Sequence, residues 1–349
     1  MKAIIYFTMA VALLVTGCNK PSPAPVPGPE QYDRYIFFSQ KVDTKAELIE
    51  SAASVDQFGV VGFKYANTTK WNTYKTGSIT PNVFYDEDGE LLEGAETVDC
   101  DEDGYGEYSP LQGWSNTKKY TFFAYYPLDK TSLVNTDGTA YTGGVPAIRY
   151  EMNADDLKGS MRDVMTAAST PDLYWNSTSD NNVTNAEVAF NFTHRLSSLG
   201  VRVKNSSSGN ITLTSVTLKL SGISYQEIVI PLDGSAGKAD GTSMDAELAL
   251  TLADSDKSIT KAGEKEVSDK LIFIPQTNEL SAQVVIGYKR ENTDEYTGYT
   301  DTMTLPAVTT VLTEGIKHLI NLNFTDSTVG VQVTTDGWVD MDDVYDTFN

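Results

Sequence analysis

Residue types that build many active sites are scarce in this chain of 349 residues, which contains two cysteines and two histidines. A histidine-based metal site or a serine–histidine–aspartate triad would need His194 or His318, and both lie in strand-like segments. The motifs G-x-S-x-G, G-x-x-x-x-G-K-[ST] and H-E-x-x-H do not occur. The sequence therefore suggests no enzyme activity and no cofactor.

Basic residues are also few, with 26 Lys and Arg against 48 Asp and Glu and a formal net charge of −22. Such an acidic chain repels the phosphate backbone, so we expect no nucleic-acid partner. Long apolar runs are missing as well. The run at residues 4–15 is shorter than the roughly 20 residues that a membrane-spanning helix needs.

The N-terminus has the pattern of a bacterial lipoprotein signal. Lys2 supplies a positive start, the apolar run follows, and Gly17 precedes Cys18. We therefore expect residues 1–17 to be a signal peptide and Cys18 to carry the lipid. Residues 18–31 contain alternating prolines, which favour an extended tether. The predicted location is the outer membrane, with lipid anchoring through Cys18 and display at the cell surface. Once Cys18 is acylated, Cys100 has no cysteine left for an internal disulfide.

The remainder of the chain predicts an all-β fold. Segments of alternating apolar and polar residues, rich in Thr, Val and Tyr, are separated by Gly, Asn, Asp and Pro. Helical periodicity is scarce, with a short helical turn expected at 244–248. This pattern favours packed antiparallel sandwiches. The polar run at 176–185 divides the body into an N-terminal domain, 32–185, and a C-terminal domain, 186–349.

One acidic loop resembles the beginning of a calcium-binding loop. Asp99, Asp101 and Asp103 have the D-x-D-x-D-G spacing that places carboxylates on one side of a turn. The twelfth position, which should be a bidentate Glu, is Pro110. The segment is a weak calcium candidate, and the alternative is a solvated acidic turn.

Aromatic residues are common and allow two interpretations. Exposed Trp and Tyr side chains can stack on sugar rings, whereas alternation within 120–127 indicates that one face packs in a core. The four tryptophans are Trp71, Trp114, Trp175 and Trp338.

A series of motifs resembles the fimbrillin-like proteins of Bacteroides and relatives. In order along the chain they are FGVVGF (58–63), YTFFAYYP (120–127), DVMTA (163–167), VAFNFTHRLS (188–197), ITLTSV (211–216), LIFIPQ (271–276), KHLINL (317–322) and Trp338. The resemblance implies two tandem transthyretin-like antiparallel β-sandwich domains. It also implies a stalk, tip or anchor subunit of type V pili, whose partners are other pilus subunits of the same or a related kind.

The resemblance further implies assembly by strand addition. A protease of trypsin-like preference removes the lipidated segment together with the first strand, and the vacated groove accepts a strand from a neighbouring subunit. The matching cleavage dipeptide is Lys45-Ala46, with Lys41 and Arg34 as alternatives. The candidate displaced strand contains Tyr35, Ile36, Phe37, Phe38 and Val42, and the candidate donor contains Val329, Val331, Val333 and Trp338. The alternative is that both are permanent strands of one folded monomer.

A rival function is a glycan-binding surface lipoprotein of a polysaccharide-uptake system. A flat cluster of exposed Trp and Tyr on one face would favour it, and a hydrolase would need carboxylates that converge in a cleft. The ordered motifs favour a pilus or adhesion subunit, whose host or bacterial surface ligand the sequence does not define.

Overall fold

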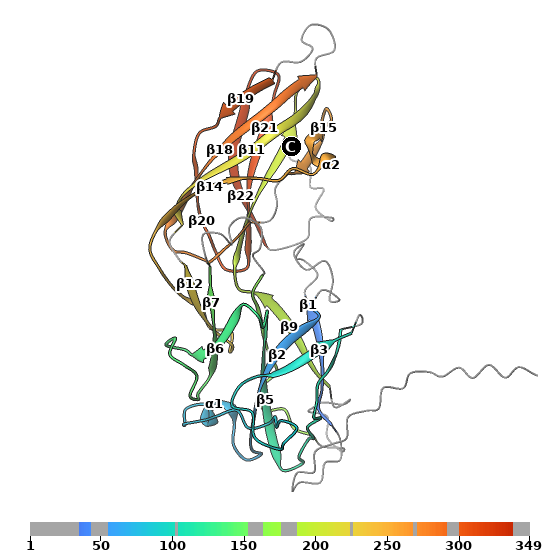
Figure 1. Cartoon of the computed structure of the whole chain (residues 1–349), viewed down its shortest axis with the longest axis vertical. Helices are drawn as coiled ribbons and strands as arrows, with labels where there is room; N and C mark the ends of the chain where they lie inside the picture. Colours follow the sequence, from blue (N-terminus) through green and yellow to red (C-terminus); the bar gives the residue numbers. More distant parts are fainter. Residues whose placement is uncertain are drawn as a thin grey trace, which may run out of the picture.

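The computed structural model is an elongated all-β molecule, with the N-terminal part at one end and the C-terminal part at the other (Figure 1). The prediction of an all-β fold built from packed sheets is confirmed. Among the described residues, no helix is both long and apolar enough to cross a membrane. The structure describes residues 35–42, 55–101, 104–152, 163–175, 187–223, 226–267, 271–291 and 300–337.

The first sheet closes on itself. In spatial order it contains β1 (Phe37–Val42), β4 (Tyr105–Glu107), β3 (Glu96–Cys100), β2 (Gln57–Ala66), β5 (Lys118–Tyr126), β8 (Met165–Ala168) and β9 (Glu187–His194), and β9 returns to β1. Aromatic side chains from β1, β2, β5 and β9 fill its interior. The strand nearest the N-terminus therefore completes the sheet between β4 and β9.

A second sheet connects the two parts of the chain. Its order is β13 (Lys238–Asp240), β12 (Glu227–Pro231), β7 (Pro146–Glu151) and β6 (Thr131–Asn135). β12 pairs antiparallel with β7 along its whole length, from Glu227 opposite Glu151 to Pro231 opposite Ala147. A hairpin from the C-terminal part thus completes a sheet begun by the N-terminal part. The short helix α1 (Trp71–Tyr74) lies in the same region.

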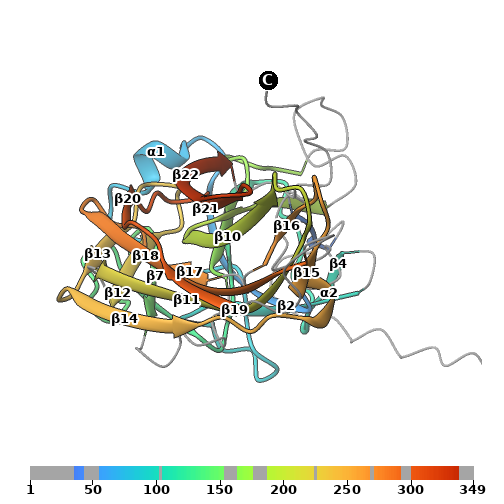
Figure 2. The same ribbon diagram turned by 90° about the horizontal axis from the view of Figure 1, so that it is seen from above.

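Two further sheets pack face to face over a shared core, as the view from above shows (Figure 2). One contains β16 (Glu264–Glu266), β10 (Ser197–Asn205), β21 (Ile316–Phe324) and β22 (Val329–Gly337), with β17 (Leu271–Phe273) also on β10. The other contains β14 (Met244–Ala249), β11 (Asn210–Ile223), β18 (Glu279–Glu291) and β19 (Thr300–Thr304), with β15 (Ser258–Ile259) on β11 and β20 (Val308–Val311) on β18. The short helix α2 (Asp254–Lys257) precedes β15.

β2 and β5 are buried on both faces. Val60 and Phe122 point into the closed sheet, whereas Phe63 and Phe123 point into the core shared with the rest of the molecule. A strand covered on both sides has no need of polar alternation, which explains the nearly continuous apolar runs at 58–63 and 120–127. The expectation that 120–127 packs in a core is confirmed, and a second layer covers the other face as well.

Three features differ from a simple antiparallel tandem. β1 pairs parallel with β9, and β10 pairs parallel with β21. Residues 244–248, expected to form a helical turn, lie in β14, because pairing with β11 buries the alternate residue Leu248. β9, which begins just after the proposed division at 185/186, pairs with β8 and β1, so sheet membership changes between His194 and Ser197.

Candidate functional site

The first strand is held along both of its edges. On one side, all six residues of β1 pair in parallel with β9, from Phe37 opposite Glu187 to Val42 opposite Phe192. On the other side, Phe38 pairs with Gly106 of β4 in the antiparallel sense. Since β4 and β9 meet only through β1 among the described strands, removing β1 would open the closed sheet and leave two unpaired edges.

The inward face of β1 is seated in an aromatic hollow. The Phe38 side chain is 1% exposed. Its ring centroid lies 5.4 Å from those of Tyr108 and Phe122, 5.6 Å from that of Phe190 and 6.1 Å from that of Phe84. Ring pairs at these separations add to the area term of burial. Phe38 therefore fills the centre of the sheet interior.

Polar groups fix the ends of the same face. The side-chain amide of Gln40, itself buried, donates from Nε2 to the carbonyl oxygen of Val55 at 2.9 Å. Tyr108 donates its hydroxyl to the carbonyl oxygen of Ile36 at 3.0 Å, and burial raises the pKa of that hydroxyl. The Ile36 amide donates to Gln112 O at 2.8 Å. These bonds specify where along the groove the strand sits.

A glycine on β4 makes room for a side chain of the neighbouring β3. A Cβ atom built on Gly106 would lie 2.4 Å from Cγ1 of Val98 and at an ordinary contact distance of 3.5 Å from Cβ of Phe38. Any side chain at this position must therefore displace Val98, which packs on the inward face of the closed sheet.

The outward face of β1 is less covered. Phe37 is 43% exposed, and Tyr105 on the neighbouring β4 is 56% exposed. Ser39 Oγ donates a hydrogen bond to a carboxylate oxygen of Glu187 on β9. Ile36 and Phe38, by contrast, are almost fully buried, so the inward face makes most of the apolar contacts of this segment.

Several predicted site residues lie outside the described residues. These are Cys18, Lys45, Ala46, Asp103 and Trp338. The lipid attachment, the cleavage dipeptide and the last tryptophan therefore remain predictions.

The candidate donor strand is β22, which pairs with β21 over nine positions, from Val329 opposite Phe324 to Gly337 opposite Ile316. Within the described chain it is the last strand of its sheet. Val329, Val331 and Val333 are half-buried and pack against the large core. In this structure β22 thus belongs to the fold of its own chain.

The acidic loop has ordinary turn contacts. Asp99 Oδ1 accepts from the Gln57 side chain at 2.8 Å, and Asp101 Oδ1 accepts from the Tyr105 amide at 2.8 Å. Within the described ranges, no group of three or more His, Cys, Asp or Glu side chains is arranged to hold a metal ion. Burial and the surrounding carboxylates raise the pKa of the Cys100 thiol to about 12, so this thiol is poorly nucleophilic.

The tryptophans that the structure describes do not present flat open rings. Trp71 is 5% exposed and Trp114 is 1% exposed, and Trp175 is half-buried against the interior of the first sheet. These three rings serve the core.

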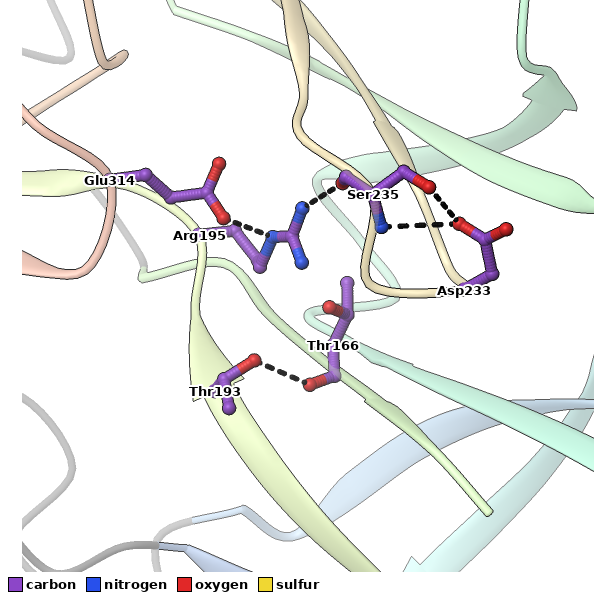
Figure 3. A network of polar contacts seen from close by, with 6 residues as sticks. All are labelled: Thr166, Thr193, Arg195, Asp233, Ser235 and Glu314. Atoms are coloured by element: carbon purple, nitrogen blue, oxygen red, sulfur yellow. Dashed lines mark hydrogen bonds and ion pairs between the residues drawn. The ribbon is translucent and has the colours of Figure 1, made fainter. Parts of the chain in front are cut away.

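Sequence reasoning missed a polar network at the junction of the two parts (Figure 3). Arg195, between β9 and β10, is 4% exposed; its Nε lies 2.9 Å from Oε1 of Glu314, and its Nη2 donates to Ser235 O at 2.6 Å. Asp233 Oδ1 accepts from the Ser235 amide at 3.1 Å. Arg195 thus joins three segments. These are the connection between β9 and β10, in which it lies, the turn before β21, which carries Glu314, and the β12–β13 loop, which carries Ser235.

The two histidines also serve the structure. His194 Nδ1 contacts a carboxylate oxygen of Asp163, whose pKa is raised by burial. His318 is 1% exposed, and its Nε2 accepts from the Thr313 amide at 3.3 Å. Because Nε2 is an acceptor, the ring is neutral and Nδ1 donates to Thr310 Oγ1 at 2.9 Å. Position in a strand was the only signal for either histidine, and it could not reveal these contacts.

Comparison with known proteins agrees with this architecture. The model of the family described as fimbrillin-like matches residues 44–338. The fimbrium subunit Fim1C of Phocaeicola vulgatus is 26% identical over 331 residues, covering 82% of this chain and 83% of that protein. The crystal structure of a fimbrial protein from Bacteroides vulgatus ATCC 8482 aligns with a TM-score of 0.63 and 21% identity, covering 88% of this chain and all of that one. The chain therefore belongs to the fimbrillin-like family and is a pilus or adhesion subunit of the cell surface.

Proposed function

We propose that this fimbrial subunit is exported as a lipoprotein acylated at Cys18 and is assembled by strand addition. In this model, cleavage next to Lys45 frees β1, and an extended segment of a neighbouring subunit takes its place between β4 and β9. The lipidated precursor is held at the outer membrane until that cut is made.

The observation that carries the proposal is the position of β1 in the closed sheet. It is a six-residue strand at the N-terminal end of the described chain, and it supplies the pairing between β4 and β9. Its loss would expose the aromatic hollow around Phe38 together with unpaired backbone groups on both sides. An incoming strand would satisfy both at once, which gives strand addition a large driving force.

The proposed donor is the C-terminal segment that contains Val329, Val331, Val333 and Trp338. Among the described strands β22 is at the edge of its sheet and its valines are half-buried, so its withdrawal breaks pairing with one neighbour, whereas withdrawal of β1 breaks pairing with two. The cost of withdrawal is the ladder with β21. Donation would be favoured when the segment gains two paired edges in place of one.

Limited trypsin digestion of residues 19–349 tests the proposal, with intact mass and an unboiled gel as readouts. We expect one early cut near Lys45, followed by a ladder of stable multimers. The K45A variant should resist the early cut and remain monomeric. A wild-type product that is cut and stays monomeric would exclude self-assembly by strand exchange.

A further inference from the structure

We call the groove that β1 occupies between β4 and β9 the β1 seat. We propose that the orientation of a strand in this seat is set by the order of two inward side chains, an aromatic ring at the Phe38 position and an amide two residues later at the Gln40 position. The inference rests on the strand addition proposed above and deepens it, because it defines the chemistry of the incoming strand.

The backbone of the groove does not select an orientation in favour of β1. β4 runs antiparallel to β1 and β9 runs parallel to it, so a strand inserted either way has one parallel and one antiparallel neighbour. A reversed strand would even gain the slightly stronger antiparallel pairing along β9, the longer of the two neighbours. For a separate strand, which has no covalent connection to the sheet, the orientation must therefore come from side chains.

Two inward side chains of β1, Phe38 and Gln40, have very different surroundings. Phe38 occupies a hollow built from aromatic rings, whereas Gln40 faces a buried backbone acceptor, the carbonyl oxygen of Val55. Both side chains are more than nine-tenths buried. The Phe38 position therefore favours an apolar ring, and the Gln40 position favours a hydrogen-bond donor.

Reversal of the strand about Ser39 would exchange the positions of these two side chains. The amide would enter the aromatic hollow, where the rings offer it no carbonyl acceptor, and the phenyl ring would lie against the Val55 carbonyl oxygen. Each error leaves a buried polar group without its partner. A strand reading aromatic-x-amide therefore binds as β1 does, and a strand reading amide-x-aromatic binds in the opposite direction.

The partner defined by this geometry is an extended segment of a neighbouring subunit that carries an aromatic residue and, two positions toward its C-terminus, Gln or Asn. The segment from 329 to 349 has three aromatic residues: Trp338 and Tyr345 are followed two positions later by Asp340 and Thr347, and Phe348 is followed directly by Asn349. No aromatic residue within 329–349 is followed two positions later by Gln or Asn, so we expect a related subunit that carries this pair to occupy the β1 position more tightly than this tail does.

Disulfide cross-linking of a peptide tests the orientation directly. The protein is residues 19–349 with C100S and a specific protease site inserted within 43–54, and it is cut and then refolded with excess peptide. One version carries N191C and the other carries E187C, at the β9 positions opposite Lys41 and Phe37. The peptide is residues 35–42 with K41C. In the orientation of β1 its thiol lies beside position 191, and when reversed about Ser39 it lies beside position 187.

We expect the native peptide to favour position 191 by about tenfold, because an unpaired buried amide costs on the order of a factor of ten in affinity. A peptide of identical composition with F38Q and Q40F should favour position 187 instead. The matched control, F37S, changes only the exposed outward side chain and should behave as the native peptide.

Equal yields at both positions, or the same preference for all three peptides, would overturn the orientation rule while leaving strand addition intact. Failure of the native peptide to cross-link at either position would show that the groove does not accept a strand, and would end both proposals.

Discussion

The strands at the two ends of the described chain, β1 and β22, are held in contrasting ways. β1 lies between two neighbours, and its inward residues Phe38 and Gln40 are at most 3% exposed. β22 is longer, with nine residues against six, yet it has one strand neighbour in its sheet and its valines are only half-buried. Loss of the shorter strand, β1, would therefore disrupt its sheet more than loss of β22 would disrupt its own.

This contrast shows that closure matters more than length. Removing β22 would leave one exposed edge on a sheet that keeps its core, whereas removing β1 would open a ring and empty an aromatic hollow. A strand suited to be replaced and a strand suited to be donated have these two different relations to their sheets.

The largest test of the contrast truncates one buried side chain on each strand. We expect F38A to destabilise the first sheet by about 3–5 kcal/mol, because a large cavity replaces a core aromatic ring. V331A should cost about 1 kcal/mol, because a half-buried valine loses little apolar area. Hydrogen exchange of β9 and β21 amides, read by mass spectrometry, measures each sheet separately.

The exposed neighbour Phe37 supplies the control for the first strand. F37A should leave β9 exchange nearly unchanged, since this side chain is 43% exposed. Equal losses in F38A and V331A would contradict the view that β1 has the dominant role.

A second test fills the room that Gly106 of β4 leaves beside Val98. G106A should cost about 1–3 kcal/mol, since the new methyl group overlaps Val98 of β3 and disturbs the packing of the sheet interior beside β1. Gly94, around which an added Cβ meets no atom within 4 Å, is the matched site. Urea denaturation should show a lower midpoint for G106A and little change for G94A. A tolerated G106A would mean that Val98 can move without disturbing the closed sheet.

The third test concerns the junction at Arg195, which we expect to couple the stability of the sheet that contains β1 to that of the sheet that contains β22. R195M should cost about 1–2 kcal/mol, because it removes the donors held by Glu314 and Ser235 while Glu314 keeps partial solvation. We expect faster hydrogen exchange in both β9 and β10. R149M, which breaks a more exposed pair with Glu227 at 3.1 Å, should have a smaller effect. An effect confined to one side of the junction would show that Arg195 does not couple the two parts.

The smallest expected effect is a pH response of opposite sign at the two strands. Glu96, 8% exposed and facing inward with Val98, has its pKa raised by burial from 4.5 to about 7. The folded form therefore holds this proton more tightly, and the first sheet loses stability as pH rises from about 4.5 to about 7. Burial lowers the pKa of His318 in β21 from 6.5, so the sheet that contains β22 loses stability as pH falls below 6.5.

Exchange measured at pH 5 and pH 7.5, corrected for intrinsic rates, should show β9 better protected at the lower pH and β22 better protected at the higher. E96Q and H318Q should each flatten one response and leave the other. A common direction in both sheets would contradict the assigned causes.

Particular elements show where sequence reasoning succeeded. Strands such as Glu187–His194 alternate clearly, and the spacing of turn residues was enough to predict an all-β fold. At 244–248, the helix-favouring residues Ala246, Glu247 and Leu248 misled the prediction, because pairing with β11 overrides local propensity. The candidate first strand was located correctly by its apolar pattern, but its parallel pairing with β9 depends on contacts between residues about 150 positions apart.

By itself, the sequence determined the strand content, the acidic surface and the signal-like start, because these follow from composition and from short-range periodicity. Only the tertiary structure decided that β1 closes a sheet, that Gln40 meets Val55 and that Arg195 joins three segments. Pairing partners, closure and buried polar contacts depend on which distant segments meet. Local patterns carry no direct signal for that choice, since many pairings of similar apolar strands satisfy the same alternation.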